Sequence, residues 1–162
     1  MLVVSIVGAL VIPRLANSTG AGRLDSQVQG AVSLCRKARA LATSEGRTYL
    51  VVLEPLERRL VLARRRDPLA EPNNEANPEQ ELVEGSTRWS KPLPFEEGVD
   101  LVIVEQDEVE LPLDGEEPLE VAFYAQGSAD PVRLTFQGPG GDRLVVEVAG
   151  STGLARIGEE LQ

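Results

Sequence analysis

A length of 162 residues accommodates one folded domain with an appendage, and a composition of 42% hydrophobic and 26% charged residues is sufficient for a packed core. The formal net charge of −10 disfavours nucleic acid as a partner, because an acidic surface repels phosphate backbones. Histidine is absent and the single cysteine, Cys35, cannot form an internal disulfide, so neither a histidine-based catalytic centre nor a disulfide framework is expected.

The chain begins with an unbroken apolar run over residues 1–12, MLVVSIVGALVI. As a helix this run would be roughly 18 Å long, whereas the hydrocarbon core of a bilayer needs about 30 Å, so the run is too short to span a membrane by itself. A cleaved signal peptide is the alternative, but the run lacks a preceding basic segment and continues beyond Pro13 into a segment with a helical pattern. The sequence therefore favours a retained helix over a signal peptide.

We expect an apolar helix over residues 1–22 that anchors the chain in a membrane or packs in the core of a filament. Pro13 removes one helical hydrogen-bond donor and should kink this helix, and Gly20 and Gly22 should weaken it, so a bend or a melted stretch is expected there. The residues predicted to form the kink and the membrane anchor are Gly8, Ile12, Pro13 and Leu15.

The following segment, residues 24–45, has the pattern of an amphipathic helix that ends near Gly46. Apolar or small residues recur in steps of four and three, and the remaining positions carry mainly charged and polar side chains. We expect this stripe to pack on a β-sheet, with Cys35 as a small core residue rather than a nucleophile, because no histidine is present to activate it. The residues predicted to make the helix–sheet contact are Leu24, Val28, Ala31, Cys35 and Ala38.

Seven short runs rich in aliphatic and β-branched residues predict antiparallel strands after Gly46. They cover residues 48–54, 58–64, 99–105, 119–124, 132–137, 144–148 and 154–157. Two acidic segments, 66–88 and 106–118, are expected to be loops, the first of them a solvated insertion without core residues. The predicted fold class is α+β, with a long N-terminal helix packed on antiparallel β-sheets and residues 23–162 forming the globular domain.

Short motifs spread over most of the chain resemble those of the type IV pilin superfamily. They are Ile12-Pro13-Arg14-Leu15-Ala16 before an amphipathic helix, Leu93-Pro94 followed by Gly98-Val99, Phe123-Tyr124-Ala125-Gln126-Gly127-Ser128, and Ser151-Thr152-Gly153-Leu154-Ala155-Arg156-Ile157. Together they look like the minor pseudopilin H group (GspH) of type II secretion systems and its relatives among the minor type IV pilins, the FimT group. The resemblance implies a pilin-like fold for the whole domain.

The resemblance further implies a minor pseudopilin, a structural and non-enzymatic subunit of the pseudopilus that takes part in protein secretion. The alternative is a minor type IV pilin for pilus assembly or DNA uptake. A pseudopilin would pack with other pseudopilins through helix–helix contacts, and its single-pass helix would sit in the inner membrane with the globular domain in the periplasm. It would have no nucleic-acid or small-molecule partner.

The family's prepilin motif, a basic leader followed by glycine, phenylalanine and glutamate, does not occur in this sequence. If Pro13 matches the helix proline of the family, the sequence starts some residues after the usual processing site. We therefore expect an in-frame leader upstream of Met1, the alternative being that the leader is lost, and leader cleavage and N-methylation depend on which of the two holds.

Two charged clusters are candidates for binding chemistry, and for each the plainer interpretation is favoured. The first supplies oxygen ligands of the kind that Ca²⁺ prefers, but its spacing matches no EF-hand loop, so a solvated loop is expected. The second is basic and would suit DNA, yet the chain is acidic, and local ion pairs with Glu54 and Glu57 are expected instead. The first cluster is Asp107, Glu108, Glu110, Asp114, Glu116 and Glu117, and the second is Arg58, Arg59, Arg64, Arg65 and Arg66. No catalytic residue, cofactor or metal site is predicted.

Overall fold

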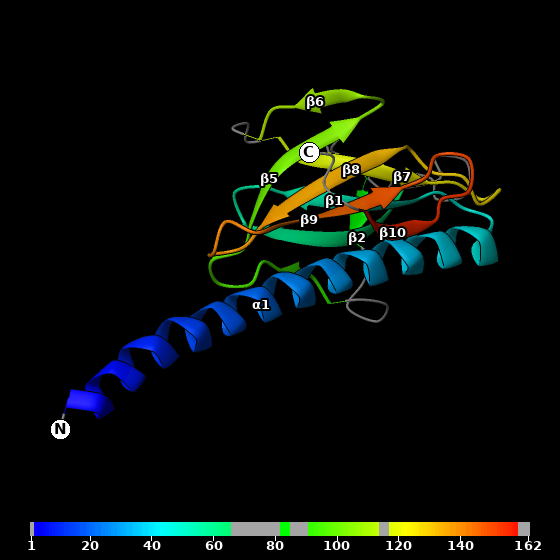
Figure 1. Ribbon diagram of the computed structural model, residues 1–162. Coiled ribbons are helices and arrows are strands. Elements are labelled where there is room, and N and C mark those ends of the chain that lie inside the picture. Colours follow the sequence, from blue (N-terminus) through cyan, green and yellow to red (C-terminus); the bar gives the residue numbers. More distant parts are fainter. Residues whose placement is uncertain (1, 66–81, 85–90, 114–116, 159–162) are drawn as a thin grey trace.

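The computed structural model describes residues 2–65, 82–84, 91–113 and 117–158, in which one long helix precedes a series of short strands (Figure 1). The helix α1 spans Leu2–Glu45, which is 44 residues. Gly46 follows it with a φ of 65°, the left-handed conformation that a helix C-terminus favours and that glycine adopts without a steric penalty. The predicted α+β fold of an N-terminal helix on antiparallel β-sheets is confirmed.

The strands form two five-stranded antiparallel sheets. In the first sheet the order is β3 (Leu82–Glu84), β2 (Arg59–Arg65), β1 (Tyr49–Glu54) and β7 (Leu119–Phe123), and β4 (Leu93–Pro94) also pairs with β2. In the second sheet the order is β10 (Ala155–Gly158), β9 (Arg143–Val148), β8 (Val132–Gln137), β5 (Asp100–Gln106) and β6 (Val109–Leu111).

The register of the strands places alternate side chains on opposite faces of each sheet, as a pleated strand requires. The β1–β2 hairpin pairs Tyr49 with Arg64 and Glu54 with Arg59. The β8–β9 hairpin pairs Val132 with Val148 and closes through a turn in which the amide of Gly138 donates to the carbonyl of Asp142 at 2.9 Å. The stretches Val-Leu-Ala and Val-Arg-Leu-Thr-Phe in these hairpins supply the branched and aromatic residues that strands favour.

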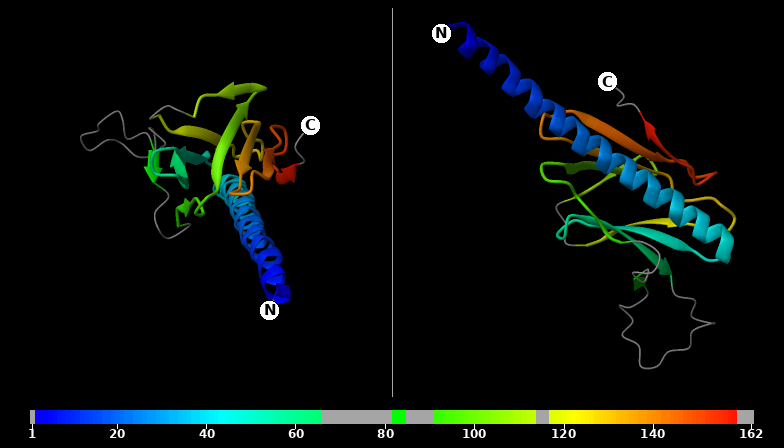
Figure 2. Two further views of the ribbon diagram at one scale, coloured as in Figure 1. Left: turned by 60° about the vertical axis from the view of Figure 1, so that its left-hand side comes forward. Right: turned by 90° about the horizontal axis from the view of Figure 1, so that it is seen from below.

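The main core lies where the C-terminal part of α1 crosses both sheets (Figure 2). The helix contributes its apolar stripe, and each sheet contributes the side chains of one face. Phe95 packs edge-on against Phe136, with ring centroids 5.9 Å apart, and joins the segment before β5 to this core. The sheet residues of the core include Tyr49, Val51, Leu53, Leu60, Leu62, Val121, Phe123, Val104, Val132, Leu134, Phe136, Val146 and Val148.

Three strands were absent from the sequence-based prediction. The expectation that 66–88 contains only a loop is wrong at Leu82–Glu84, because β3 pairs with β2; residues 66–81 and 85–88 lie outside the described part. The expectation of a loop over 106–118 is wrong at Val109–Leu111, because β6 pairs with β5. Both strands, like β4, are too short to show an alternation of apolar and polar residues.

The helix does not melt at its glycines. α1 passes through Pro13, Gly20 and Gly22 without interruption and is drawn as one gently curved helix in Figure 1, so the expectation of a melted stretch is wrong. A Cβ on Gly20 would lie 2.9 Å from Pro139 Cγ, so this glycine lets the β8–β9 turn approach the helix closely. The kink at Pro13 and the division of the chain at residues 22 and 23 stay predictions.

Candidate functional site

The helix α1 has two parts with different surroundings. We call residues 20–45 the seated half, because it lies against the two sheets, and residues 2–19 the projecting half, because Figures 1 and 2 show it extending beyond them. The contact of Gly20 with Pro139 and that of Leu24 with Gly138 mark where the seated half begins. The seated half therefore carries the helix residues that belong to the main core.

The seated half buries the whole stripe that was predicted to contact a sheet. The exposed fractions are 2% for Leu24, 0% for Val28, 0% for Ala31, 1% for Cys35 and 0% for Ala38, and all five belong to the main core. The alanines keep the helix backbone close to the strands, and burying each larger aliphatic side chain stabilises the fold by about 1.5–3 kcal/mol. Val32, Leu34 and Ala42 are buried beside them.

Gln27 is a buried polar residue of the seated half that the sequence analysis did not single out. Its exposed fraction is 1%, and its side-chain oxygen accepts a hydrogen bond of 2.9 Å from the amide of Glu96. Nearby, Arg23 donates to the carbonyl of Glu97 at 3.3 Å, and Leu93 packs against Gly30, where an added Cβ would lie 3.0 Å from Leu93 Cδ1. These contacts attach the segment between β4 and β5 to the helix.

Two arginines attach the end of the helix to loops of the sheets. Arg39 Nε donates to the carbonyl of Thr152 at 2.7 Å and to that of Gly127 at 3.3 Å, and Arg36 Nε donates to the carbonyl of Ala155 at 3.3 Å. A Cβ on Gly153 would lie 2.5 Å from the Gly127 carbonyl oxygen, so the two loops are in direct contact beneath Arg39. The motifs Phe123–Ser128 and Ser151–Ile157 therefore meet at the C-terminal end of α1.

Among the described residues, burial raises the pKa of two titratable groups. Desolvation raises the pKa of the Cys35 thiol from 9.0 to about 12, which leaves it protonated and unreactive at neutral pH. Desolvation, followed by the hydrogen bond of 2.7 Å to Glu45, raises the pKa of Tyr49 to about 12. The prediction that Cys35 is a core residue is thus confirmed by its burial.

The residues predicted to anchor the chain in a membrane, Gly8, Ile12, Pro13 and Leu15, all lie in the projecting half. Their side chains are outside the described part of the structure, so their anchoring role stays a prediction. Among the described residues no helix has an apolar stretch long enough to cross a bilayer.

The described members of the acidic cluster do not gather around one point. Asp107 and Glu108 form the exposed turn between β5 and β6, with φ values of 51° and 65°, and Asp114 and Glu116 lie outside the described residues. Within the described residues, no group of three or more potential metal ligands comes together.

Two arginines of the basic cluster, Arg58 and Arg59, form ion pairs. Arg58 Nη2 lies 2.8 Å from Asp100 Oδ1, and Arg59 pairs with Glu54 and Glu57 as predicted. Arg64 also takes part in an interaction. The side chain of Arg65 and the whole of Arg66 are outside the described part of the structure.

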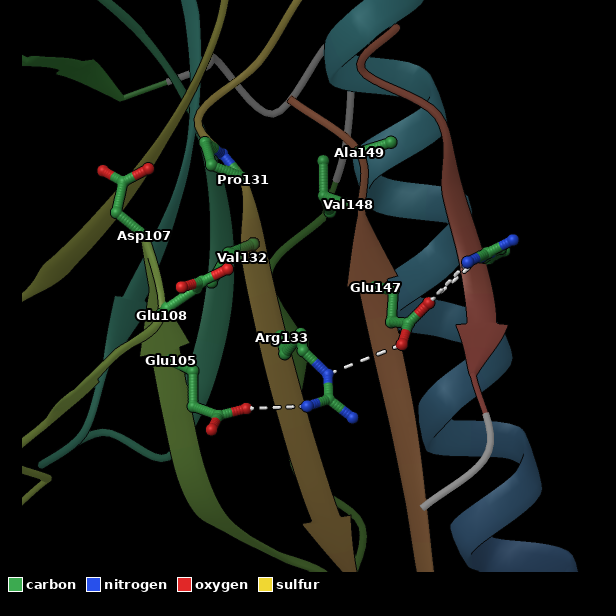
Figure 3. A pocket seen from close by; sticks show the side chains of 10 residues that line it. Glu105, Asp107, Glu108, Pro131, Val132, Arg133, Glu147, Val148 and Ala149 are labelled. Carbon is green, nitrogen blue, oxygen red and sulfur yellow. Dashed lines mark hydrogen bonds and ion pairs between the residues drawn. The ribbon is translucent and has the colours of Figure 1, made fainter. Parts of the chain in front are cut away.

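An open groove of about 510 Å³ lies over the second sheet, on the face turned away from α1 (Figure 3). Charged side chains of alternating sign cross four strands beside it. Arg133 Nη1 lies 3.1 Å from Glu105 Oε2 and its Nε lies 3.5 Å from Glu147 Oε1, while Arg156 Nη2 lies 2.9 Å from Glu147 Oε2. The register sets these neighbours, since Arg133 is directly opposite Glu105 on one side and Glu147 on the other.

A helix seated on two antiparallel sheets, with its N-terminal part projecting beyond them (Figure 1), defines a pilin-like α+β architecture. The fold is that of the minor pseudopilins of type II secretion systems. Two structures of the minor pseudopilin EpsH of Vibrio cholerae are similar to this chain at 14% identity, with TM-scores of 0.59 and 0.62. The matches cover 83% and 86% of this chain and 95% and 98% of the EpsH chains.

The solution structure of Escherichia coli GspH is also similar, at 15% identity and a TM-score of 0.51, over 86% of this chain and 88% of that one. No protein-family model and no curated protein sequence matches the chain. At these identities the comparisons establish a shared fold, and the predicted pilin-like fold is confirmed by them.

Proposed function

We propose that this chain is a minor pseudopilin, a structural subunit of a type II secretion pseudopilus that acts by shape and packing rather than by catalysis. The observation that carries the proposal is α1, whose projecting half is apolar in sequence up to Ile12 and lies beyond the sheets, on a domain with the fold of EpsH and GspH. Such a helix offers an apolar surface that only lipid or other helices can cover.

In the proposed assembly the projecting half packs with the helices of other pseudopilins after leaving the inner membrane. The domain stands in the periplasm, and the chain is anchored by a single-pass helix. Leader cleavage and N-methylation belong to this proposal if an in-frame leader precedes Met1. The burial of Leu24, Val28 and Ala38 supports the proposal, because it fixes the helix to the domain. Packing of the projecting half in a filament would therefore also fix the position of the domain on that filament.

A secretion assay in the organism that encodes the chain tests this proposal. The gene is deleted and then complemented with the wild type, with Val7→Asp, or with the matched control Val7→Leu. We expect loss of secreted proteins from the medium on deletion and recovery with the wild type and Val7→Leu. Recovery should fail with Val7→Asp, because a charge within an apolar helix–helix or helix–lipid contact is costly.

Two results would count against the proposal. Normal secretion after deletion would remove the role in type II secretion, and a simultaneous loss of pili or of DNA uptake would identify a minor type IV pilin instead. Full complementation by Val7→Asp would show that the projecting half does not act through apolar packing. Immunoblotting for equal protein levels separates these outcomes from degradation.

A further inference from the structure

The turn between β1 and β2 lies at the end of the domain from which α1 projects (Figure 2), and an open apolar pocket adjoins it. The pocket has a volume of about 350 Å³, and side chains from both sheets and from segments next to them line it. We call it the base pocket. It is separate from the groove over the second sheet, because the two share no lining residue. The apolar lining residues are Leu53, Pro55, Leu56, Phe95, Leu101 and Leu113.

The base pocket adjoins the root of the projecting half. A Cβ on Gly20 would lie 2.9 Å from Pro139 Cγ, and a Cβ on Gly98 would lie 3.3 Å from Pro139 Cβ. The next residue, Val99, accepts a hydrogen bond of 3.0 Å from Nη2 of Arg58, which lines the pocket. Packed helices lie with their axes about 8–10 Å apart. A helix that packs along the projecting half and extends past Gly20 would therefore run against this end of the domain.

Leu56 presents an apolar side chain at the edge of the base pocket. Its exposed fraction of 72% is the largest among the large hydrophobic side chains of the described residues. The turn that carries it is held in place, because the amide of Arg58 donates to the carbonyl of Pro55 at 3.2 Å. The guanidinium group of Arg58 also donates to the carbonyl of Val99, just before β5. A side chain presented by a fixed turn loses little conformational freedom on docking.

The charges of the base pocket neutralise each other. Its charged lining residues within the described part of the chain are Arg58 and Asp100, and Arg58 Nη2 lies 2.8 Å from Asp100 Oδ1. A charged occupant would have to compete with this ion pair, whereas an uncharged apolar occupant leaves it intact. The run of residues 1–12 shows the chemistry of such an occupant, since it is mainly aliphatic and has no charged side chain. Contact with a helix of this kind would also remove the apolar surface of Leu56 from water.

We propose that the base pocket docks the apolar N-terminal helix of a neighbouring pseudopilin. That helix packs beside the projecting half and places aliphatic side chains against Leu56, Phe95 and Leu101. The position of the pocket at the root of the projecting half selects this occupant, because a single helix can then contact α1 and the domain together. The inference rests on the proposed function and adds to it the contact that the partner helix makes on the domain.

Photo-cross-linking in the organism that encodes the chain tests the inference. A photoreactive amino acid replaces Leu56 in one strain, Val109 in a second and Val7 in a third, and mass spectrometry identifies the residue of the partner in each adduct. Val109 is the matched control, because it is apolar and 60% exposed but lies on β6, outside the base pocket. Immunoblotting establishes that the three proteins are present in equal amounts.

We expect Leu56 to give adducts with the apolar helix of another pseudopilin, in a yield about tenfold above that of Val109. Leu56→Asp should likewise lower secretion by about tenfold, and Val109→Asp by less than about twofold, because a charge is costly where an apolar contact is made and not at an exposed position.

Pseudopilin adducts at Val7 with none at Leu56, or adducts of Leu56 with lipid alone, would overturn the inference and leave the proposed function standing. Full secretion with Leu56→Asp would overturn it in the same way. Absence of pseudopilin adducts at Val7 would instead mean that the proposed function fails, and the inference with it.

Discussion

The two halves of α1 differ in their surroundings and in their composition. The seated half alternates alanines with larger aliphatic residues and is fixed by arginines to carbonyl groups of the sheet loops. The projecting half is composed almost entirely of aliphatic residues up to Ile12 and extends beyond the sheets (Figure 1). Substitutions in the seated half should change the stability of the domain. Substitutions in the projecting half should change the binding of partners.

The comparison predicts that the same substitution has a large effect on stability in the seated half and a small effect in the projecting half. Val28→Asp places a charge at a position with 0% exposure and should lower the free energy of unfolding by more than about 4 kcal/mol, or prevent folding. Val7→Asp should change it by less than about 0.5 kcal/mol. Urea denaturation in detergent, followed by circular dichroism, measures both. Similar losses for the two variants would mean that the projecting half also packs on the domain.

Two glycines compare a crowded loop beneath Arg39 with an open position on the helix. Gly153→Ala should lower the free energy of unfolding by about 1–3 kcal/mol, because the new Cβ would lie 2.5 Å from the Gly127 oxygen and φ is 60°. Gly22→Ala is the matched control, since its Cβ meets nothing within 4 Å, and it should raise stability by up to about 1 kcal/mol. Thermal denaturation of both variants gives the comparison, and a stable Gly153→Ala protein would contradict the close contact of the two loops.

The buried thiol predicts a dependence of stability on pH. Cys35 keeps its proton in the folded state until about pH 12, whereas the unfolded thiol loses it near pH 9.0, so the folded state binds more protons in this window. Stability is therefore fully present below pH 9 and falls as the pH rises, by about 1.4 kcal/mol per unit for this group.

Unfolding curves at pH 9 and pH 10 should show a steeper loss for the wild type than for Cys35→Ala. The Tyr49 hydroxyl, with its ordinary pKa of 10.0 raised by burial, also lowers stability as the pH approaches 10, but it does so equally in both proteins and cancels in the comparison. A thiol reagent should modify Cys35 only on unfolding. Rapid modification of the native protein, or parallel slopes for the two proteins, would show that Cys35 is not buried as described.

The arginine contacts are expected to have the smallest effect. Arg39→Met removes two hydrogen bonds to carbonyls and should lower the free energy of unfolding by about 1 kcal/mol. Arg36→Met removes one long hydrogen bond and should cost less. Hydrogen exchange should show faster opening of the loop around Gly153 in the Arg39 variant alone. Unchanged exchange there would mean that the loops hold each other without the arginine.

The parts of the fold with a repeating pattern were predictable from the sequence. The stripe from Leu24 to Ala38 has the helical period, and β8 was predicted with its observed bounds, residues 132–137, because β-branched and aromatic residues fill it. The short strand β6 and the acceptors of Arg39 were not predictable. A main-chain carbonyl carries no sequence signal, and a strand of three residues shows no alternation.

The groove was missed for a related reason. Glu105, Arg133, Glu147 and Arg156 are far apart in sequence and become neighbours only through the register of β5, β8, β9 and β10. Strand order and register could not be derived from the sequence, so the cluster had no detectable pattern. Asp107 and Glu108 were identified only as members of a six-residue acidic cluster, and their position at the rim required the structure.

Photo-cross-linking from the projecting half tests the central claim most directly. A photoreactive amino acid replaces Val7 in the organism that encodes the chain, and the adducts are identified by mass spectrometry. The account predicts adducts with other pseudopilins of the same secretion system, formed only when the secretion machinery is expressed. Adducts with lipid or unrelated proteins alone, in cells that contain the assembled machinery, would contradict the assignment of this helix to a pseudopilus.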